Sequence, residues 1–131
     1  MTISTNISAY AGDALLNWIK GTTMPTAPSS IYASLWNGDP DASGVELTGT
    51  VGLTSQAVTW GSVASNQMSS SADINFGTAT GAGAGPVLYV VLADNATYAG
   101  HHQIAKKAIS STALSNGLVV KILSGNLTLG Y

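Results

Sequence analysis

Beyond its first thirty residues, the chain is divided into short apolar stretches separated by groups of turn-forming residues. Residues 31–36 alternate apolar with more polar side chains, and Asn37-Gly38-Asp39-Pro40 then ends the stretch. Alternation with a period of two is typical of a half-buried strand, and Asn, Gly, Asp and Pro favour turns. We therefore predict an all-β fold, a single antiparallel, jelly-roll-like β-sandwich. Further strands are expected at 45–48, 56–60, 72–76, 87–93, 101–109, 118–123 and 127–129.

One stretch, residues 7–20, has helical periodicity instead. Its apolar side chains recur at spacings of three and four, which predicts one N-terminal amphipathic α-helix. Asn6 or Ser8 can cap the first turn, and Gly21 follows where a left-handed residue often ends a helix. So short a helix is marginal alone, and we expect it to pack on the sheet or on another subunit. The predicted division is 1–24 for the N-terminal arm and helix and 25–131 for the β-sandwich.

The stretch 87–93 is apolar at every position rather than at alternate ones. Continuous hydrophobicity indicates a strand that is covered on both faces. One face is expected to meet the sandwich core, and the other the helix or a partner.

Charged residues are unusually rare. They make up 8% of the chain, against about 25% in ordinary soluble domains. A surface with so few charges is weakly protected against association, which suits a protein covered by neighbours. Four lysines, no arginine and a net charge of -2 argue against nucleic acid as a partner. No apolar stretch is long enough to span a membrane, and the N-terminus lacks the pattern of a signal peptide.

No motif indicates catalysis, a cofactor or a metal. We therefore expect that the chain is not an enzyme, binds no cofactor, and has no catalytic or metal-binding residues. His101 and His102 are neighbours, and side chains of neighbouring residues in a strand face opposite ways. Asp39 and Asp41 could together hold calcium, but turn chemistry explains them as well. The glycine-rich loop 81–85 lacks the Lys-Ser/Thr of a phosphate-binding loop. No serine has the G-x-S-x-G context, and the chain has no cysteine.

The aromatic side chains leave two alternatives open. Trp18, Trp36 and Trp60, with five tyrosines, either fill a core or an interface or form a platform that binds sugars. We favour the first, with an interface that includes Ile7, Ala11, Leu15, Trp18, Ile19 and Trp36.

Several segments that together span most of the chain share one pattern: Ala14-Leu15-Leu16-Asn17-Trp18-Ile19, Pro28, Ile31 to Pro40, Val45-Glu46-Leu47, 72–76 and 87–92. In these segments the chain resembles a family of small bacteriophage virion proteins often labelled tail fibre proteins. By analogy of size and architecture, the chain also resembles the β-sandwich cement proteins that decorate phage heads.

The resemblance implies a non-enzymatic virion structural protein, located in the phage particle and assembled in the host cytoplasm. The favoured role is a capsid decoration or cement protein that binds the major capsid protein or other virion subunits. It is expected to associate with itself as a dimer or trimer. The alternative is a small tail, tail-fibre or baseplate component, and a host-glycan-binding module comes after that.

Overall fold

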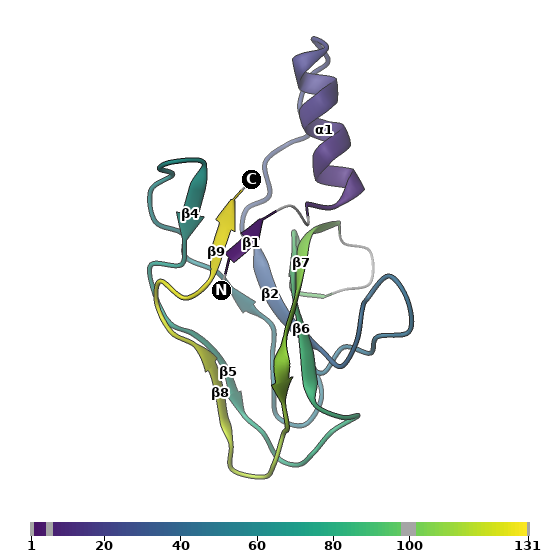
Figure 1. Cartoon of the computed structure of the whole chain (residues 1–131), viewed down its shortest axis with the longest axis vertical. Helices are drawn as coiled ribbons and strands as arrows, with labels where there is room; N and C mark the ends of the chain where they lie inside the picture. The colour runs from purple at the N-terminus through teal and green to yellow at the C-terminus, as the bar shows by residue number, and fades with distance from the viewer. Residues whose placement is uncertain (1, 5–6, 98–101, 131) are drawn as a thin grey trace.

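The computed structural model describes residues 2–4, 7–97 and 102–130, with the side chains of 2–4 left out of the description (Figure 1). Strand β1 (Thr2–Ser4) precedes helix α1 (Ala9–Ile19), and strands follow from there to the C-terminal end. They are β2 (Tyr32–Trp36), β3 (Gln56–Ala57), β4 (Gln67–Ser69), β5 (Ile74–Thr78), β6 (Val87–Ala93), β7 (Gln103–Thr112), β8 (Val119–Ile122) and β9 (Thr128–Gly130).

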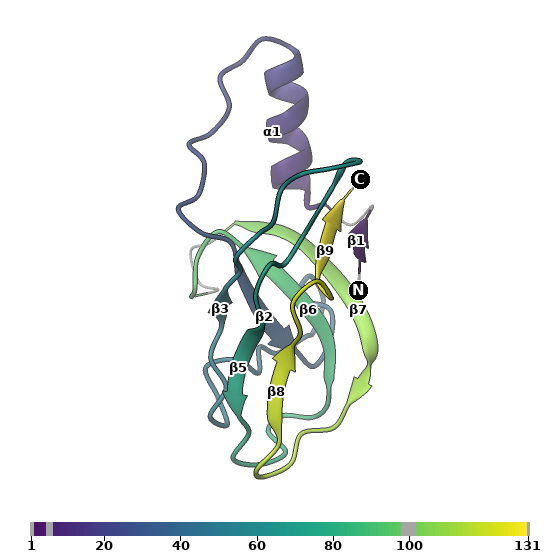
Figure 2. The same cartoon turned by 90° about the vertical axis from the view of Figure 1, so that its left-hand side faces the viewer.

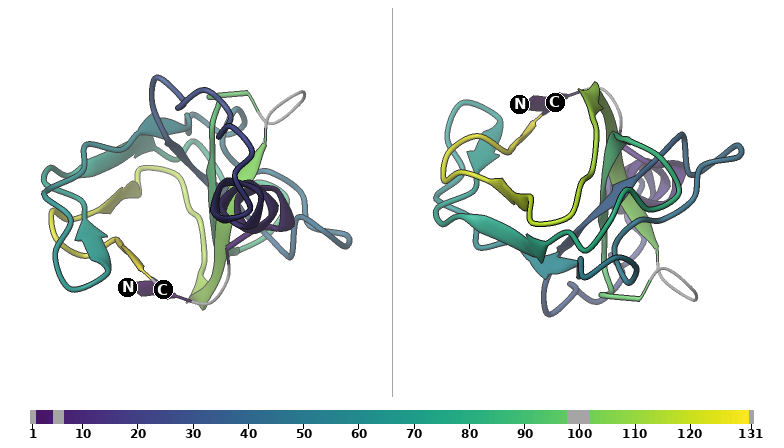
Figure 3. Two further views of the ribbon diagram at one scale, coloured as in Figure 1. Left: turned by 90° about the horizontal axis from the view of Figure 1, so that it is seen from above. Right: turned by 90° about the horizontal axis from the view of Figure 1, so that it is seen from below.

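The strands form one four-stranded sheet, in the order β3-β2-β6-β7, and two smaller sheets, β1-β9-β4 and β5-β8. Neighbouring strands are antiparallel except for the pair β1 and β9, which is parallel. The two smaller sheets lie across the core from the four-stranded sheet (Figures 2 and 3). The predicted all-β class with a single helix is confirmed.

The core lies between the sheets. Leu35 on β2 is paired with Val90 on β6, and both point inward with Phe76 of β5. Leu47 and Leu53, from the connection between β2 and β3, are also fully enclosed. The core therefore draws on the long loops as well as on the strands.

Strand β6 has the bounds that its continuous hydrophobicity predicts, and it is covered on both faces. Val91 on its outer face is fully buried, and neighbouring Trp36 is only 5% exposed. The connection 37–46 lies on this outer side (Figure 3). It is held there by Lys106 of β7, which donates hydrogen bonds to Asp39 and Asp41. This connection, rather than the helix, covers the outer face beside Lys106.

Several element boundaries differ from the prediction. The stretch 45–48 forms only a single bridge, between Glu46 and Trp36, and 56–60 contributes a strand of two residues. Strands β1 and β4 are not foreseen, because each is three residues long and is stabilised by pairing with β9, which is distant in the sequence. The predicted boundary between arm and sandwich, at residues 24 and 25, stays a prediction.

Candidate interaction surface

Helix α1 stands away from the sandwich, with its C-terminal end farthest out (Figures 1 and 2). None of its residues is buried. At its base, the backbone N–H of Ser8 donates to the carbonyl of Ile104 in β7, at 2.8 Å. The segment that leads to β2 then runs back toward the sandwich (Figure 2). The helix is therefore anchored at its base and exposed from Leu15 onward, whereas Ala11 and Ala14 are half-buried and line a pocket with the returning segment 24–28.

Local capping defines both ends of the helix. The Ser8 hydroxyl accepts a hydrogen bond from the Ala11 N–H at 3.2 Å, as expected of an N-cap serine. Asn6, the other predicted cap, lies outside the described residues. Gly21 adopts a φ of +98°, and its N–H donates to the Trp18 carbonyl at 2.9 Å. Glycine takes this conformation without steric cost, so the predicted helix end is confirmed.

An aromatic stack fixes the base of the helix. The rings of Tyr10 and His102 lie 4.0 Å apart and are nearly parallel, at 8°. His102 also contacts Asp94, through its ring Nδ1 at 2.8 Å and its backbone N–H at 2.7 Å. His102 thus links the helix to the end of β6, a role that the sequence does not reveal. His101, its neighbour, lies outside the described residues.

Large apolar side chains on the helix are exposed to solvent. Leu16, Trp18 and Ile19 are exposed by 65%, 57% and 67%, and Leu15 by 43%. The two charged residues of this region, Asp13 and Lys20, lie on the other side of the helix, as the 3.6-residue period requires. We call the surface formed by Ile7, Ala11, Ala14, Leu15, Leu16, Trp18 and Ile19 the helix face.

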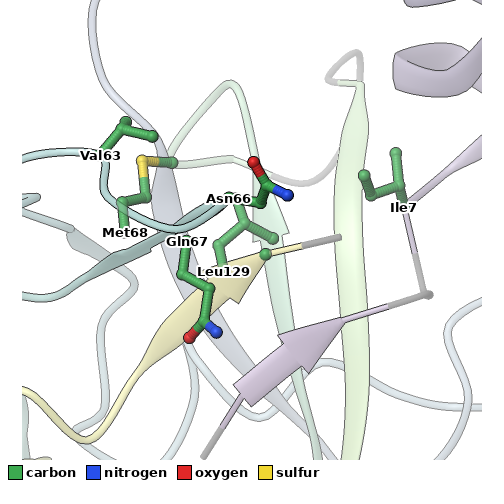
Figure 4. A pocket seen from close by; sticks show the side chains of 7 residues that line it. Ile7, Val63, Asn66, Gln67, Met68 and Leu129 are labelled. Atoms are coloured by element: carbon green, nitrogen blue, oxygen red, sulfur yellow. The ribbon is translucent and has the colours of Figure 1, made fainter.

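The apolar surface continues at the base of the helix into a shallow pocket (Figure 4). Ile7 lines it from the segment before α1, Met68 from β4 and Leu129 from β9. Val63, in the connection between β3 and β4, also lines the pocket and is 72% exposed. One end of the molecule therefore presents a broad apolar surface made of the helix face and this pocket.

Five of the six predicted interface residues, Ile7, Ala11, Leu15, Trp18 and Ile19, lie together on the helix face. The sixth, Trp36, is buried, and its indole N–H donates to the Ser34 hydroxyl at 2.9 Å. We therefore leave it out of the candidate surface. Sequence reasoning missed Leu16 and Val63. Leu16 lies at the margin of the apolar stripe, and no local pattern marks an exposed loop valine.

The tryptophans do not form a common platform. Trp36 is buried and Trp60 is partly buried against the core, so Trp18 alone of the three is well exposed. The choice between an interface and a sugar site stays a prediction.

The two carboxylates considered for calcium instead bind a lysine. Lys106 Nζ is 2.7 Å from Asp41 Oδ2 and also donates to Asp39 Oδ1. The hydrogen bond from Lys106, with a smaller one from the Asp41 N–H, lowers the pKa of Asp39. Burial lowers the pKa of Lys106, but its bonds to the two carboxylates outweigh this and raise it. Within the described residues, no three His, Asp or Glu side chains come close enough to hold a metal ion.

The fold and this surface define an all-β protein whose helix α1 presents an apolar face to solvent. The chain belongs to the family described as Podophage GP4 fiber I protein gp80, whose family model matches residues 6–130. No curated protein matches the chain. It is therefore a phage structural protein of the fibre type and a virion component. The match fits the tail or fibre alternative better than capsid decoration, for which it gives no support.

Across the described part of the chain, no helix has the length and hydropathy needed to cross a membrane.

Proposed function

We propose that the chain is a non-enzymatic subunit of a phage tail fibre and that it joins other virion subunits through the helix face. The observation that carries the proposal is a helix with no buried residue and four large apolar side chains open to solvent. Nucleic acid and membrane are not among its partners in this proposal, and no cofactor is involved. Its place is the assembled particle.

The energetics of the helix support this role. An isolated helix shorter than about 12–15 residues is marginal in water, and α1 has 11. Fully burying a Leu or Ile side chain contributes about 1.5–3 kcal/mol. The exposed fractions of Ile7, Leu15, Leu16, Trp18 and Ile19 then correspond to a gross gain of roughly 4–8 kcal/mol per subunit, against which the cost of association is set. This gain stabilises the helix and the contact together.

The lack of charge on the helix face indicates what the partner surface is like. A charged partner patch would lose its hydration against this face without gaining an ion pair. The partner surface is therefore apolar, with the few charged residues of α1 left in water. This matches the interior of an assembly better than a reversible contact with a polar ligand.

The proposal is tested by introducing Trp18→Glu into the phage and measuring the chain in purified particles by quantitative mass spectrometry. The charge would be buried without a partner, so we expect the chain to be lost from particles. Asn17→Glu is the matched control, since it adds the same charge to an exposed neighbouring position outside the helix face. Wild-type incorporation of Trp18→Glu would contradict the proposal.

The position of the chain in the phage particle is tested by cryo-electron microscopy of intact particles. Density for the chain at the tail vertex, and none repeated over the head shell, is the expected result. Density repeated over the shell would overturn the fibre assignment in favour of capsid decoration.

A further inference from the structure

We propose that the gap between strands β7 and β8 takes up an extended segment of a different virion protein as an additional strand. We call it the β7–β8 gap, and it is bounded by residues 109–112 of β7 and by Val119–Ile122 of β8. The contact is separate from the helix face and goes beyond the proposed function. It is carried by two free strand edges, a cavity between them and a lysine without a counter-charge.

Both strands that border the gap have a free edge. Strand β7 is the last strand of the four-stranded sheet and β8 is the outer strand of the two-stranded sheet, and they are not paired with each other (Figure 1). Ala105 of β7 bridges to Ile7, and beyond it no segment that the structure describes pairs with this edge. A free edge presents backbone N–H and C=O groups, which an added strand can satisfy.

A strand already lies in the neighbouring position between the two sheets. Strand β1 pairs in parallel with β9 and also contacts β7 (Figure 2). It has only three residues, and β8 pairs with β5 alone among the described strands. A segment added beside β8 therefore extends a strand position that the fold already uses.

The gap leads into the core of the sandwich. A cavity of about 120 Å³ lies between the two free edges. Ile109 and Thr112 line it from β7, Val120 and Ile122 line it from β8, and Phe76 lines it from the core. Apolar cavities of about this size hold a small apolar group in other proteins. Because alternate side chains of a strand face the same side, every second residue of the segment is apolar, and one of these fills the cavity.

A half-buried lysine next to the gap indicates the charge of the segment. Lys107 is paired with Val90, a core residue, so its side chain lies on the core side of the sheet, as does that of Ile109 two residues later. No carboxylate among the described residues forms an ion pair with Lys107. A partly buried charge is costly unless it is paired. The segment therefore carries an Asp or Glu two residues from the apolar residue that fills the cavity.

The same charge argument excludes a second copy of this chain as the source of the segment. Asp13 lies on helix α1, so it is not part of an extended segment. The other five acidic side chains contact Lys106, Lys121, His102 or Thr48 within the fold: Asp39, Asp41, Glu46, Asp73 and Asp94. The exposed connection 22–30 has no acidic residue and contains Pro25 and Pro28, which cannot donate a hydrogen bond to a neighbouring strand. The segment therefore comes from a different virion protein.

The first test compares hydrogen–deuterium exchange of the chain in purified phage particles with that of the purified full chain, by mass spectrometry. An added strand takes up the free backbone groups of both edges. The amides of residues 109–112 and 119–122 should therefore exchange more slowly in particles, on the order of tenfold. Equal exchange in the two samples, at either strand, overturns the proposal.

Filling the cavity should block the added strand. Val120→Phe places a larger side chain in the cavity, so we expect the slow exchange at residues 109–112 to be lost in particles. Val119→Phe is the matched control, because Val119 is 54% exposed and points away from the core, and it should keep the slow exchange. Urea unfolding of both purified variants verifies the fold. Slow exchange that persists in Val120→Phe contradicts the proposal.

Reversing the charge at Lys107 tests the acidic residue of the segment. Lys107→Glu places two carboxylates together, so the slow exchange should be lost, whereas Lys107→Arg should keep it. A lysine that only protects the edge against wrong pairing could be replaced by Glu without effect, since either charge serves that purpose. Slow exchange in both variants would therefore overturn the charge argument.

Photo-cross-linking in purified particles identifies the segment. A benzophenone amino acid replaces Ser110, an exposed residue at the free edge of β7, and the cross-linked peptide is sequenced by mass spectrometry. The expected peptide comes from a different virion protein and has an aliphatic residue two positions from an Asp or Glu. A peptide without that pattern, or one from another copy of this chain, overturns the proposal.

These results are independent of the test of the helix face. If Trp18→Glu is lost from particles while both edges exchange equally in the two samples, only the added strand is refuted. If both edges exchange slowly in particles and Trp18→Glu enters particles normally, the proposed function of the helix face fails and the added strand stands.

Discussion

Replacing Lys106 with Met should release the connection 37–46 from the outer face of the main sheet. Lys106 Nζ bonds Asp39 and Asp41, which lie 67 and 65 residues away in the sequence. Its side chain is 22% exposed, and those of Asp39 and Asp41 are 35% and 60% exposed. Methionine keeps the length of the stem and removes both ion pairs, which leaves two neighbouring carboxylates without a cation.

The expected loss follows from these exposures. Hydrogen bonds to charged groups contribute about 1.5–3 kcal/mol, whereas solvent-exposed ion pairs contribute about 0–1 kcal/mol. The bonds of Lys106 to Asp39 and Asp41 are partly exposed, so their contribution should lie between these ranges. The free energy of unfolding should therefore fall by about 1–2 kcal/mol. For a chain of this size, that corresponds to a Tm lower by roughly 3–10 °C.

The assay is urea unfolding followed by tryptophan fluorescence, in which buried Trp36 reports on the outer face. Lys107→Met is the matched control, because it removes the same charge from the next position of β7, and that residue faces the opposite side of the sheet. The control should lose much less stability. Equal losses in the two variants would show that net charge, rather than the bonds to Asp39 and Asp41, is responsible.

The pH dependence gives a second check. Because the bond from Lys106 lowers the pKa of Asp39 in the folded state, its contribution is fully present above the unfolded value near 3.8. The contribution is lost as the pH falls through the lowered folded pKa. The difference between wild type and Lys106→Met should therefore be constant from pH 5 to 7 and shrink below about pH 3.8. A difference that stays unchanged into strong acid would refute the role of Asp39.

Three further substitutions test other parts of the fold. Phe76→Ala removes a fully buried ring and should cost about 3–5 kcal/mol in urea unfolding; a loss under 1 kcal/mol would contradict its central place in the core. Burial raises the pKa of Glu46 above 4.5, despite a bond from the Thr48 hydroxyl, so wild-type stability falls as the pH rises through the raised value. Glu46→Gln should be more stable than wild type at pH 7 and not at pH 4, as measured by Tm. Gly52 has a φ of +77°, and a Cβ there would lie 2.6 Å from the Thr78 carbonyl oxygen. Gly52→Ala should therefore strain the backbone and lower the free energy of unfolding by about 1–3 kcal/mol. An unchanged urea midpoint would exclude this strain.

Local sequence patterns predicted the helix and strands that are determined by residues close to one another in the sequence. The helix depends on a cap, an apolar period and a terminal glycine, which all lie within residues 8–21. Strand β2 ends where Asn37 begins a run of turn formers, and β6 has the bounds of its apolar stretch. The helix face was predictable for the same reason, since five of its residues share one period.

The contacts that the sequence could not predict join residues that are distant along the chain. The bond of Lys106 to Asp39 and the stack of Tyr10 on His102 have no local signature. The side of the sheet on which Lys106 lies follows from its pairing with Val91 in β6. The burial of Trp36 has a related cause. Its alternation places it on the outer face of the sheet, and nothing nearby in the sequence shows that a later loop covers that face.

Buried and exposed side chains lie in different parts of this chain, so that one part folds the sandwich and another is available for contact with other subunits. The outer face of the main sheet, which could have been a contact surface, is closed by the chain's own loop and an ion pair. Leu15, Leu16, Trp18 and Ile19 on the helix have no such cover among the described residues. Instead, a backbone bond at Ser8 and the stack of Tyr10 hold the helix base and leave the tip free. Because the sandwich completes its own core, substitutions on the helix face should change assembly while the sandwich still folds. That separation makes Trp18→Glu informative, since a lost contact with another virion subunit can then be distinguished from a lost fold.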